Sequence, residues 1–280
     1  LMTTAAMTTN KQTLKAYYKL TKPGLVYGNA LMAIAGYLFG AAGHGSWLTF
    51  LAMLSGVCLI MAAACVFNNI IDRDIDGKMK RTANRPLITG EISVLNAVIY
   101  GSTLLVVSVL LLGFGTNLLT LGVGLFGFVA YAGLYTYSKR KTVHSTLIGT
   151  LAGATPPVIG YLAATNSFDV VALLLFSLLV AWQMPHFYAI SIFRRADYAN
   201  ANIPVLSVVK GVFATRQQMI AYAALFIVMV LLLGIYGGTS LLTVLILLLA
   251  ASYWLYLILQ PMSEQSSSSW AGKVFGWSLW

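Results

Sequence analysis

The chain alternates between long apolar runs and short polar segments. Eight of the runs reach the roughly 20 residues that an α-helix needs to cross the apolar core of a membrane; they cover residues 23–42, 47–71, 94–113, 117–138, 143–163, 168–192, 215–236 and 239–259. A ninth apolar run begins at Ala271, and the sequence ends at Trp280. The pattern therefore predicts an all-α, polytopic membrane helix bundle with about nine transmembrane helices, of which eight are complete and the ninth is truncated.

Composition excludes a soluble protein. Hydrophobic residues make up 59% of the chain, charged residues 9%, and the mean hydropathy is +0.83, far from the values of soluble domains. The two cysteines, Cys58 and Cys65, lie seven residues apart inside one apolar run. This spacing matches neither a CxxC motif nor a metal-ligand pair, so we expect both to pack as small apolar side chains.

The basic residues define the orientation in the membrane. All 17 Lys and Arg residues fall on one side if the helices alternate in direction, and the positive-inside rule places that side in the cytoplasm. We expect an N-terminal tail, residues 1–22, on the cytoplasmic face of a bacterial membrane; the alternative is the matrix side of the mitochondrial inner membrane. The net charge of +10 reflects this topology and does not indicate a nucleic-acid partner.

The first of two polar segments, residues 68–91, follows the second apolar run. If the preceding helix continues through it, Asn68, Asp72 and Asp76 recur every four residues and share one face. An amide and two carboxylates at a water-exposed helix end suit Mg²⁺, which takes few protein ligands and fills its other positions with water and phosphate. Acids and bases also mark ordinary solvated loops, but the regular spacing and the block of bases that follows favour a metal site.

The second polar segment, residues 193–214, follows the sixth apolar run. It ends in Asn202-Ile-Pro-Val-Leu, which is similar to Asn84-Arg-Pro-Leu about 118 residues earlier. The chain is thus expected to contain two four-helix repeats around a central cavity, with both polar segments over that cavity.

Three features lie within apolar runs. Thr155-Pro156-Pro157 is expected to break the fifth helix and to shape a cavity. Asn29 is expected either to pair with another helix or to meet a substrate. His186 lies inside the sixth run beside Phe187 and Tyr188, where it serves either as a hydrogen-bonded structural group or as a functional one.

The motifs as a set resemble the UbiA superfamily of intramembrane polyprenyltransferases, and within it the haem-modifying branch, the protohaem IX farnesyltransferases. The resemblance extends from residue 21 to about 211, and Trp270 to Trp280 is similar to the start of that branch's last helix. It is carried by the following phrases: Thr21-Lys-Pro-Gly24, Cys65-Val-Phe-Asn-Asn69, Ile71-Asp-Arg-Asp-Ile-Asp76, Asn84-Arg-Pro-Leu87, Thr146-Leu-Ile-Gly149, Pro156-Pro-Val-Ile-Gly-Tyr161, Trp182-Gln-Met-Pro-His186, Asp197-Tyr198 and Ala201-Asn-Ile-Pro-Val-Leu206.

The resemblance implies one transmembrane prenyltransferase domain, residues 23–280. It implies transfer of a farnesyl group from farnesyl diphosphate to a vinyl group of haem B, which yields haem O for terminal oxidases. Membrane lipid surrounds such a protein, and haem A synthase or an oxidase is an expected acceptor of the product. The chain departs from the wider superfamily in its second acidic motif, because Pro185 and Ile192 stand where acids are expected and Asp197 alone remains nearby. The number of Mg²⁺ ions is therefore left open.

The resemblance also assigns roles to residues. Asn68, Asp72 and Asp76 are expected to hold Mg²⁺, Tyr131 and Tyr135 to line the isoprenoid site, and His186 to bind the haem iron or to position water. The expected partners of the diphosphate or the haem propionates are Lys22, Asn29, Asn69, Lys78, Arg81, Arg85, Lys139, Arg140, Arg194, Arg195, Asp197, Asn202 and Lys210.

Two other functions compete with this one. A prenyltransferase that acts on a quinone precursor uses the same chemistry, but the missing second acidic cluster disfavours it. A transporter or a non-catalytic haem-handling protein fits the repeats and the broken helix, but not carboxylates at a metal-binding spacing. Release of diphosphate from farnesyl diphosphate in the presence of haem separates the enzyme from the transporter.

Overall fold

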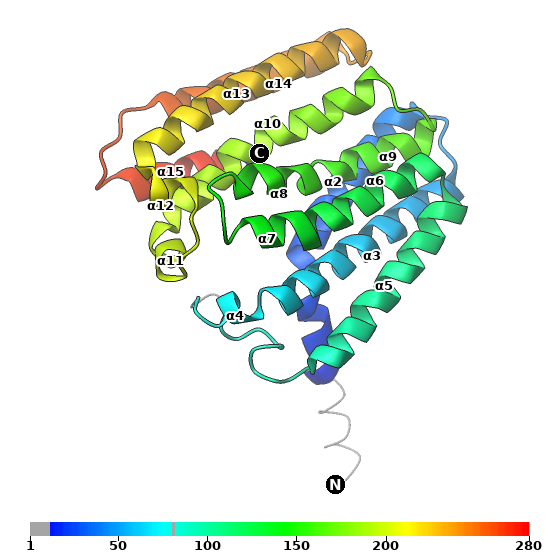
Figure 1. The fold of residues 1–280 in the computed structure, drawn as a ribbon. Helices are drawn as coiled ribbons and strands as arrows, with labels where there is room; N and C mark the ends of the chain where they lie inside the picture. The colour runs from blue at the N-terminus through cyan, green and yellow to red at the C-terminus, as the bar shows by residue number, and fades with distance from the viewer. Residues whose placement is uncertain (1–11, 80–81, 280) are drawn as a thin grey trace. The chain divides into compact units, whose positions relative to one another are not determined.

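The computed structural model describes residues 12–79 and 82–279 (Figure 1), which are mostly helical and contain no strand. Residues 12–20 form a first, short helix. The helices that follow are α2 (Pro23–Ala41), α3 (Trp47–Ile71), α4 (Arg73–Asp76), α5 (Val94–Gly115), α6 (Leu118–Val129), the π-helix η1 (Ala130–Tyr135), α7 (Thr136–Ser138), α8 (Ser145–Gly153), α9 (Thr155–Thr165), α10 (Val170–Phe193), α11 (Arg195–Asn200), α12 (Leu206–Val209), α13 (Gly211–Tyr236), α14 (Leu241–Leu259) and α15 (Ser267–Trp277).

Eight helical spans in the described residues are long and apolar enough to cross a membrane. They coincide with the eight runs in the sequence, so the predicted all-α membrane protein is confirmed. Two helix starts differ from the prediction by four residues, and the other boundaries by two residues or fewer: the seventh span begins at Gly211 rather than at residue 215, and α15 begins at Ser267 rather than at Ala271. Helix α15 starts with three serines, and the first two turns of α13 include Thr215, Arg216 and Gln217, so the apolar pattern does not detect either start.

Short polar side chains begin five of these spans. The Ser46, Ser93, Asn117, Asp169 and Ser240 side chains each accept a hydrogen bond from a backbone N–H in the first turn of α3, α5, α6, α10 and α14. Such a bond satisfies one of the N–H groups that a helix start leaves without a partner. The sequence therefore encodes the helix boundaries locally, at the membrane surface.

The chain divides into two compact units, the first of which comprises residues 1–136 and 156–167. Its core gathers around α3 and includes Met53, Val57, Ile60, Leu112 and Ile159. Glycines let α2 and α9 meet backbone to backbone: a Cβ on Gly160 would lie 2.0 Å from the Ala33 carbonyl oxygen. Small residues at such contacts are typical of packed membrane helices.

The second unit comprises residues 137–155 and 168–280, with α10 packed against α13 and α15. Its core includes Met184, Met219, Trp254 and Ile258, and α13 and α14 run side by side (Figure 1). The Arg216 guanidinium, on α13, donates to the carbonyls of residues 258–260 at distances of 2.7 to 3.1 Å. These bonds satisfy carbonyls that the end of α14 leaves without partners.

The predicted break in the fifth span is confirmed. Helix α8 ends at Gly153 and α9 begins at Thr155, because Pro156 and Pro157 lack the N–H groups that a continuous helix needs. The Thr155 hydroxyl donates to the Ala152 carbonyl at 2.8 Å and so satisfies one of the groups at the break. Helix α8 belongs to the second unit and most of α9 to the first.

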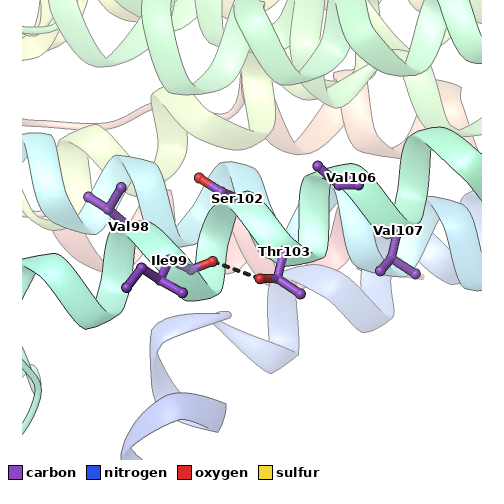
Figure 2. Close-up of a pocket in the computed structure, with 6 residues that line it drawn as sticks. All are labelled: Val98, Ile99, Ser102, Thr103, Val106 and Val107. Atoms are coloured by element: carbon purple, nitrogen blue, oxygen red, sulfur yellow. Dashed lines mark hydrogen bonds between the residues drawn. The ribbon is translucent and has the colours of Figure 1, made fainter.

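Large apolar side chains cover the outer faces of the spans; Leu241 and Leu249 of α14 are 74% and 73% exposed. Such surfaces suit lipid rather than water. A hollow of about 420 Å³ lies along α5 (Figure 2), lined by Val98, Ile99, Ser102, Thr103, Val106 and Val107. The Thr103 hydroxyl donates to the Ile99 carbonyl at 2.9 Å, and none of the lining residues is ionisable. The hollow is therefore an apolar surface feature, and the candidate site lies elsewhere.

Candidate active site

Asn68, Asp72 and Asp76 lie on one face, as their spacing predicts. Helix α3 ends at Ile71 and α4 begins at Arg73, but the four-residue hydrogen bonds continue across this junction: the Asp72 N–H donates to the Asn68 carbonyl at 2.9 Å, and the Asp76 N–H donates to the Asp72 carbonyl at 2.8 Å. Helices α3 and α4 thus keep the register of a single helix.

The expectation that this face is exposed to water is wrong. Asn68, Asp72 and Asp76 are 2%, 0% and 4% exposed. The chain after α4 folds back over them: the Thr82 hydroxyl donates to the Asp76 carbonyl at 2.7 Å, and Leu87 packs in a core cluster with Val66. The candidate site is consequently a buried polar cluster, in which electrostatic interactions are stronger than in water.

Hydrogen bonds fix the orientation of the Asn68 amide. Its Nδ2 donates to Asp72 Oδ2 at 2.7 Å and to Thr136 Oγ1 at 2.8 Å, and the Thr136 hydroxyl donates in turn to the Tyr131 carbonyl at 2.8 Å. With both amide hydrogens engaged, Oδ1 is the atom of the Asn68 side chain that can accept a hydrogen bond or bind a cation.

Two bases occupy the cluster. Lys22 Nζ donates to Asn68 Oδ1 and lies 5.8 Å from the centre of the Tyr131 ring. The Arg85 guanidinium forms a salt bridge with Asp76 Oδ2. Lys22 and Arg85 are therefore brought together with the acidic face as predicted. Lys78 is exposed in the turn after α4, and Arg81 lies outside the described residues.

The donor set fits a small divalent cation. Asn68, Asp72 and Asp76 offer one amide and two carboxylate groups, the hard oxygen donors that Mg²⁺ prefers. Within residues 12–79 and 82–279, no group of three or more His, Cys, Asp and Glu residues could hold a metal ion. A third donor beside the two carboxylates would be the amide of Asn68, which its hydrogen bonds orient.

The neighbouring asparagines have structural partners. Asn69 Nδ2 donates to the Leu20 carbonyl at 2.8 Å and anchors the N-terminal helix. Asn29 Nδ2 donates to the Leu25 carbonyl at 2.7 Å within its own helix, so the expected pairing with another helix is wrong. This bond to the preceding turn satisfies one hydrogen of the Asn29 amide within its own helix.

The predicted aromatic residues lie on a widened helical turn. Tyr131 and Tyr135 belong to η1, and their rings stack with centres 5.6 Å apart and planes inclined by 24°. The π-helical turn places Thr136 within reach of both the Tyr131 carbonyl and Asn68. Isolated π-helical turns are frequent at functional sites.

In the second polar segment, two arginines pair with acids. Arg194 lies 3.6 Å from Asp197, and Arg195 lies 3.6 Å from Glu264; both arginine side chains are about 40% exposed. Exposed pairs of this kind are weak, so these guanidinium groups remain able to exchange partners. Asn202 has a φ of 53° and is exposed, as is Lys210, whereas Lys139 and Arg140 lie half-buried after α7.

His186 is 9% exposed and is held by contacts that all lie within the second unit. Its Nδ1 lies 2.7 Å from the Ser278 hydroxyl. The imidazole stacks on Trp182 with centres 4.9 Å apart and contacts the rings of Phe187 and Phe275 at 5.2 and 5.0 Å. The proximity of Phe187 was expected, but the adjacent Tyr188 belongs to the core cluster of the unit.

Each unit contains candidate residues that the sequence did not identify. Thr136 orients Asn68, Ser278 contacts His186, and Gln183 is 4% exposed with no hydrogen-bond partner for its Nε2 among the described residues. A Cβ on Gly153 would lie 2.0 Å from Gln183 Oε1. Of these, only Gln183 carried a signal, since it lies in the phrase that ends at His186.

Curated relatives match nearly the whole chain. The protoheme IX farnesyltransferase 2 of Pseudomonas putida strain GB-1 is 43% identical over 95% of this chain and 90% of its own length. The protoheme IX farnesyltransferase of Citrobacter koseri is 44% identical over the same shares of the two chains.

Solved structures share the fold. A structure described as a digeranylgeranylglyceryl phosphate synthase superposes with a TM-score of 0.80 at 17% identity, over 95% of this chain and 94% of the other. A UbiA homologue from Archaeoglobus fulgidus, bound to GPP and Mg²⁺, superposes with a TM-score of 0.69 at 15% identity, over 94% and 98% of the two chains.

A family model agrees with both comparisons. The model of the UbiA prenyltransferase family matches residues 29–279, a range that includes the buried acidic cluster and His186. On this match and on relatives that are 43 to 44% identical along almost the entire chain, the protein belongs to the UbiA prenyltransferase family.

Proposed function

We propose that this membrane enzyme transfers the farnesyl group of farnesyl diphosphate to a vinyl group of haem B, and so forms haem O and diphosphate. Relatives that are 43% identical along 95% of the chain carry the name protoheme IX farnesyltransferase. The structural observation that carries the proposal is the buried cluster of Asn68, Asp72 and Asp76 with Lys22 and Arg85. A buried site that combines acids and bases suits a metal-bound diphosphate.

The reaction requires a stabilised leaving group. The allylic C–O bond of farnesyl diphosphate breaks, its electron pair leaves with the diphosphate, and C1 of the farnesyl group becomes cationic. Mg²⁺, when bound, supplies positive charge to the leaving diphosphate, and the donors proposed to hold it are Asn68, Asp72 and Asp76. Thr136 keeps the Asn68 amide oriented throughout.

Lys22 and Arg85 are proposed to serve in two states. Before the substrate arrives, Lys22 donates to the neutral amide oxygen of Asn68 and Arg85 pairs with the Asp76 carboxylate, because buried polar groups and charges without partners are costly. When the diphosphate binds, the same two bases donate hydrogen bonds to its oxygens. Arg85 thereby exchanges the Asp76 carboxylate for the diphosphate, Lys22 exchanges the Asn68 amide oxygen for it, and the site keeps both positive charges.

The farnesyl cation must be protected from water until it reacts. Apolar helices exclude most water, and the faces of the Tyr131 and Tyr135 rings favour the cation. C1 then bonds to the terminal vinyl carbon of haem, a water oxygen bonds to the inner vinyl carbon, and a proton is released. The addition of water explains the hydroxyethylfarnesyl side chain of haem O.

The second polar segment is proposed to serve haem. Arg194 and Arg195 hold acids only through weak pairs and suit the two propionates of haem, since guanidinium binds carboxylate through two parallel hydrogen bonds. Lys139, Arg140 and Lys210 are further candidates. Replacing either arginine is expected to raise the KM for haem more than it lowers kcat.

The proposal extends to the cellular setting. The basic loops face the cytoplasm of a bacterium by the positive-inside rule, and farnesyl diphosphate and haem B are proposed to reach the enzyme from that side. The product is proposed to pass to haem A synthase or to a terminal oxidase.

Pigment analysis tests the function. Cells that express the protein should contain a haem whose mass equals that of haem B plus one farnesyl group and one hydroxyl group. Purified protein should release diphosphate from farnesyl diphosphate only when haem B is present. The Asp72→Asn variant serves as the inactive control. Farnesylation of an aromatic quinone precursor in place of haem would favour the other prenyltransferase function, and binding of haem without diphosphate release would favour a non-catalytic protein.

A further inference from the structure

The Ser278 hydroxyl connects the end of α15 to His186 on α10. Its Oγ lies 2.7 Å from His186 Nδ1 and 2.6 Å from the Phe275 carbonyl oxygen. A hydroxyl carries one hydrogen, so it can donate to only one of these two groups. The group that receives this hydrogen determines which nitrogen of the neutral imidazole carries its own hydrogen.

The short distance between Ser278 Oγ and the Phe275 carbonyl oxygen shows which group accepts the hydroxyl hydrogen. If the Ser278 hydroxyl donated to Nδ1, Oγ and the Phe275 oxygen would face each other at 2.6 Å with no hydrogen between them, and two lone pairs would repel. If the hydroxyl donates to Phe275 instead, Oγ accepts a hydrogen from Nδ1 and every group is satisfied. Neutral His186 is therefore the tautomer with its hydrogen on Nδ1, and Nε2 carries a lone pair.

The rest of the cluster holds the ring in place. The Trp182 indole stacks on the imidazole, and its Nε1 donates to the Ser278 carbonyl at 3.2 Å. Ser278 thus contacts two side chains on α10, one through its hydroxyl and one through its backbone. The described residues provide no hydrogen-bond partner for His186 Nε2, so this nitrogen is available to a ligand.

We infer that Ser278 is a positioning residue, and that it holds His186 in the tautomer whose Nε2 binds the iron of the haem substrate. Neutral imidazole binds metal through the nitrogen that carries no hydrogen, and its other nitrogen typically donates to a neighbouring oxygen. The Ser278 hydroxyl supplies that oxygen. The identity of the ligand rests on the proposed function, whereas the tautomer does not.

The tautomer is tested without haem. The chain has three histidines, so ¹⁵N-histidine labelling of the purified full-length protein gives few NMR signals, and His186→Gln identifies those of His186. We expect a protonated Nδ1 and an unprotonated Nε2 in the wild type. Ser278→Thr should preserve this state, and Ser278→Ala should mix the two tautomers. Ser207→Ala is the matched control, because it removes another buried hydroxyl bond, to the Ser191 carbonyl, without touching His186. A hydrogen on Nε2 in the wild type would overturn the inference.

Iron binding is tested by titrating ferric haem B and recording absorption and EPR spectra. His186→Ala should lose the spectrum of an imidazole-bound iron, and Ser278→Ala should weaken haem affinity about 10-fold or more, the scale of losing a group that orients a metal ligand. Ser278→Thr and Ser207→Ala should keep both properties. An unchanged spectrum and affinity in His186→Ala, with haem O still formed, would overturn the inference and leave the proposed function intact. A wild-type protein that forms no haem O would instead refute the function.

Discussion

Neutralising Asp76 tests the metal site most directly. Asp76→Asn preserves the shape of the side chain and removes one negative charge from a group that is 4% exposed. Two unit charges about 4 Å apart at an effective dielectric constant of about 20 interact by about 4 kcal/mol, equivalent to roughly a 10³-fold effect. The substitution also frees Arg85 from its salt bridge with Asp76, so that its charge can act on the diphosphate and offset part of this loss. We therefore expect kcat/KM to fall by about 10²- to 10³-fold, the range observed when one electrostatic stabiliser is removed.

The same substitution has a calculable effect on stability. The Arg85 side chain is 24% exposed, so loss of its partner leaves a mostly buried guanidinium without a counter-charge. The Arg85–Asp76 salt bridge is intermediate between an exposed pair and a fully buried one. We therefore expect its loss to lower the free energy of unfolding by about 1 to 3 kcal/mol. Thermal unfolding in detergent measures this loss and shows whether the variant is folded at the assay temperature.

The activity assay follows diphosphate release from farnesyl diphosphate at saturating haem, over a series of Mg²⁺ concentrations. Asp74→Asn is the matched control, because Asp74 lies on the same short helix but is exposed, and its variant should remain within about 3-fold of the wild type, the range of a typical exposed charge. If a folded Asp76→Asn protein matched Asp74→Asn at every Mg²⁺ concentration, Asp76 would not be a metal ligand.

Three further predictions concern the metal, the second polar segment and the packing of the first unit. Treatment with EDTA should abolish farnesyl transfer and added Mg²⁺ should restore it; activity that persists in EDTA would argue against a divalent metal. Asp197→Asn should lower kcat/KM by less than about 10-fold, whereas Asp72→Asn should lower it by about 10²-fold or more, and equal losses in parallel assays would place a second metal ligand at Asp197. Gly160→Ala should lower the free energy of unfolding by about 1 to 3 kcal/mol, because its Cβ would lie 2.0 Å from the Ala33 carbonyl oxygen, whereas Gly122→Ala, with no atom within 4 Å, should unfold like the wild type.

Local patterns predicted most of the fold and part of the site. Apolar runs defined the eight spans, Pro156 and Pro157 marked the break in the fifth, and the spacing of Asn68, Asp72 and Asp76 gave their shared face. Each of these features depends on residues within a few turns of one another, where helical periodicity is sufficient evidence.

The remaining features depend on contacts between distant parts of the chain. The burial of the acidic face results from the segment that folds back over it, and the orientation of Asn68 depends on Thr136, 68 residues further along. The contact between His186 and Ser278 spans 92 residues. No local pattern encodes such contacts, because a serine or threonine near a helix end has many alternative partners.

The π-helical turn makes the site sensitive to the number of residues in the chain. Each residue advances an α-helix by about 100°, and η1 holds one more residue in its turn than an α-helix would. Deleting Gly133, which has no atom within 4 Å of a would-be Cβ, would remove this extra residue, return the turn to regular α-helical geometry and leave Thr136 on nearly the same face. Replacing Gly133 would leave the register unchanged. The widened turn therefore absorbs the loss of one residue, whereas an inserted residue would rotate Thr136 by about 100°, away from the Asn68 amide.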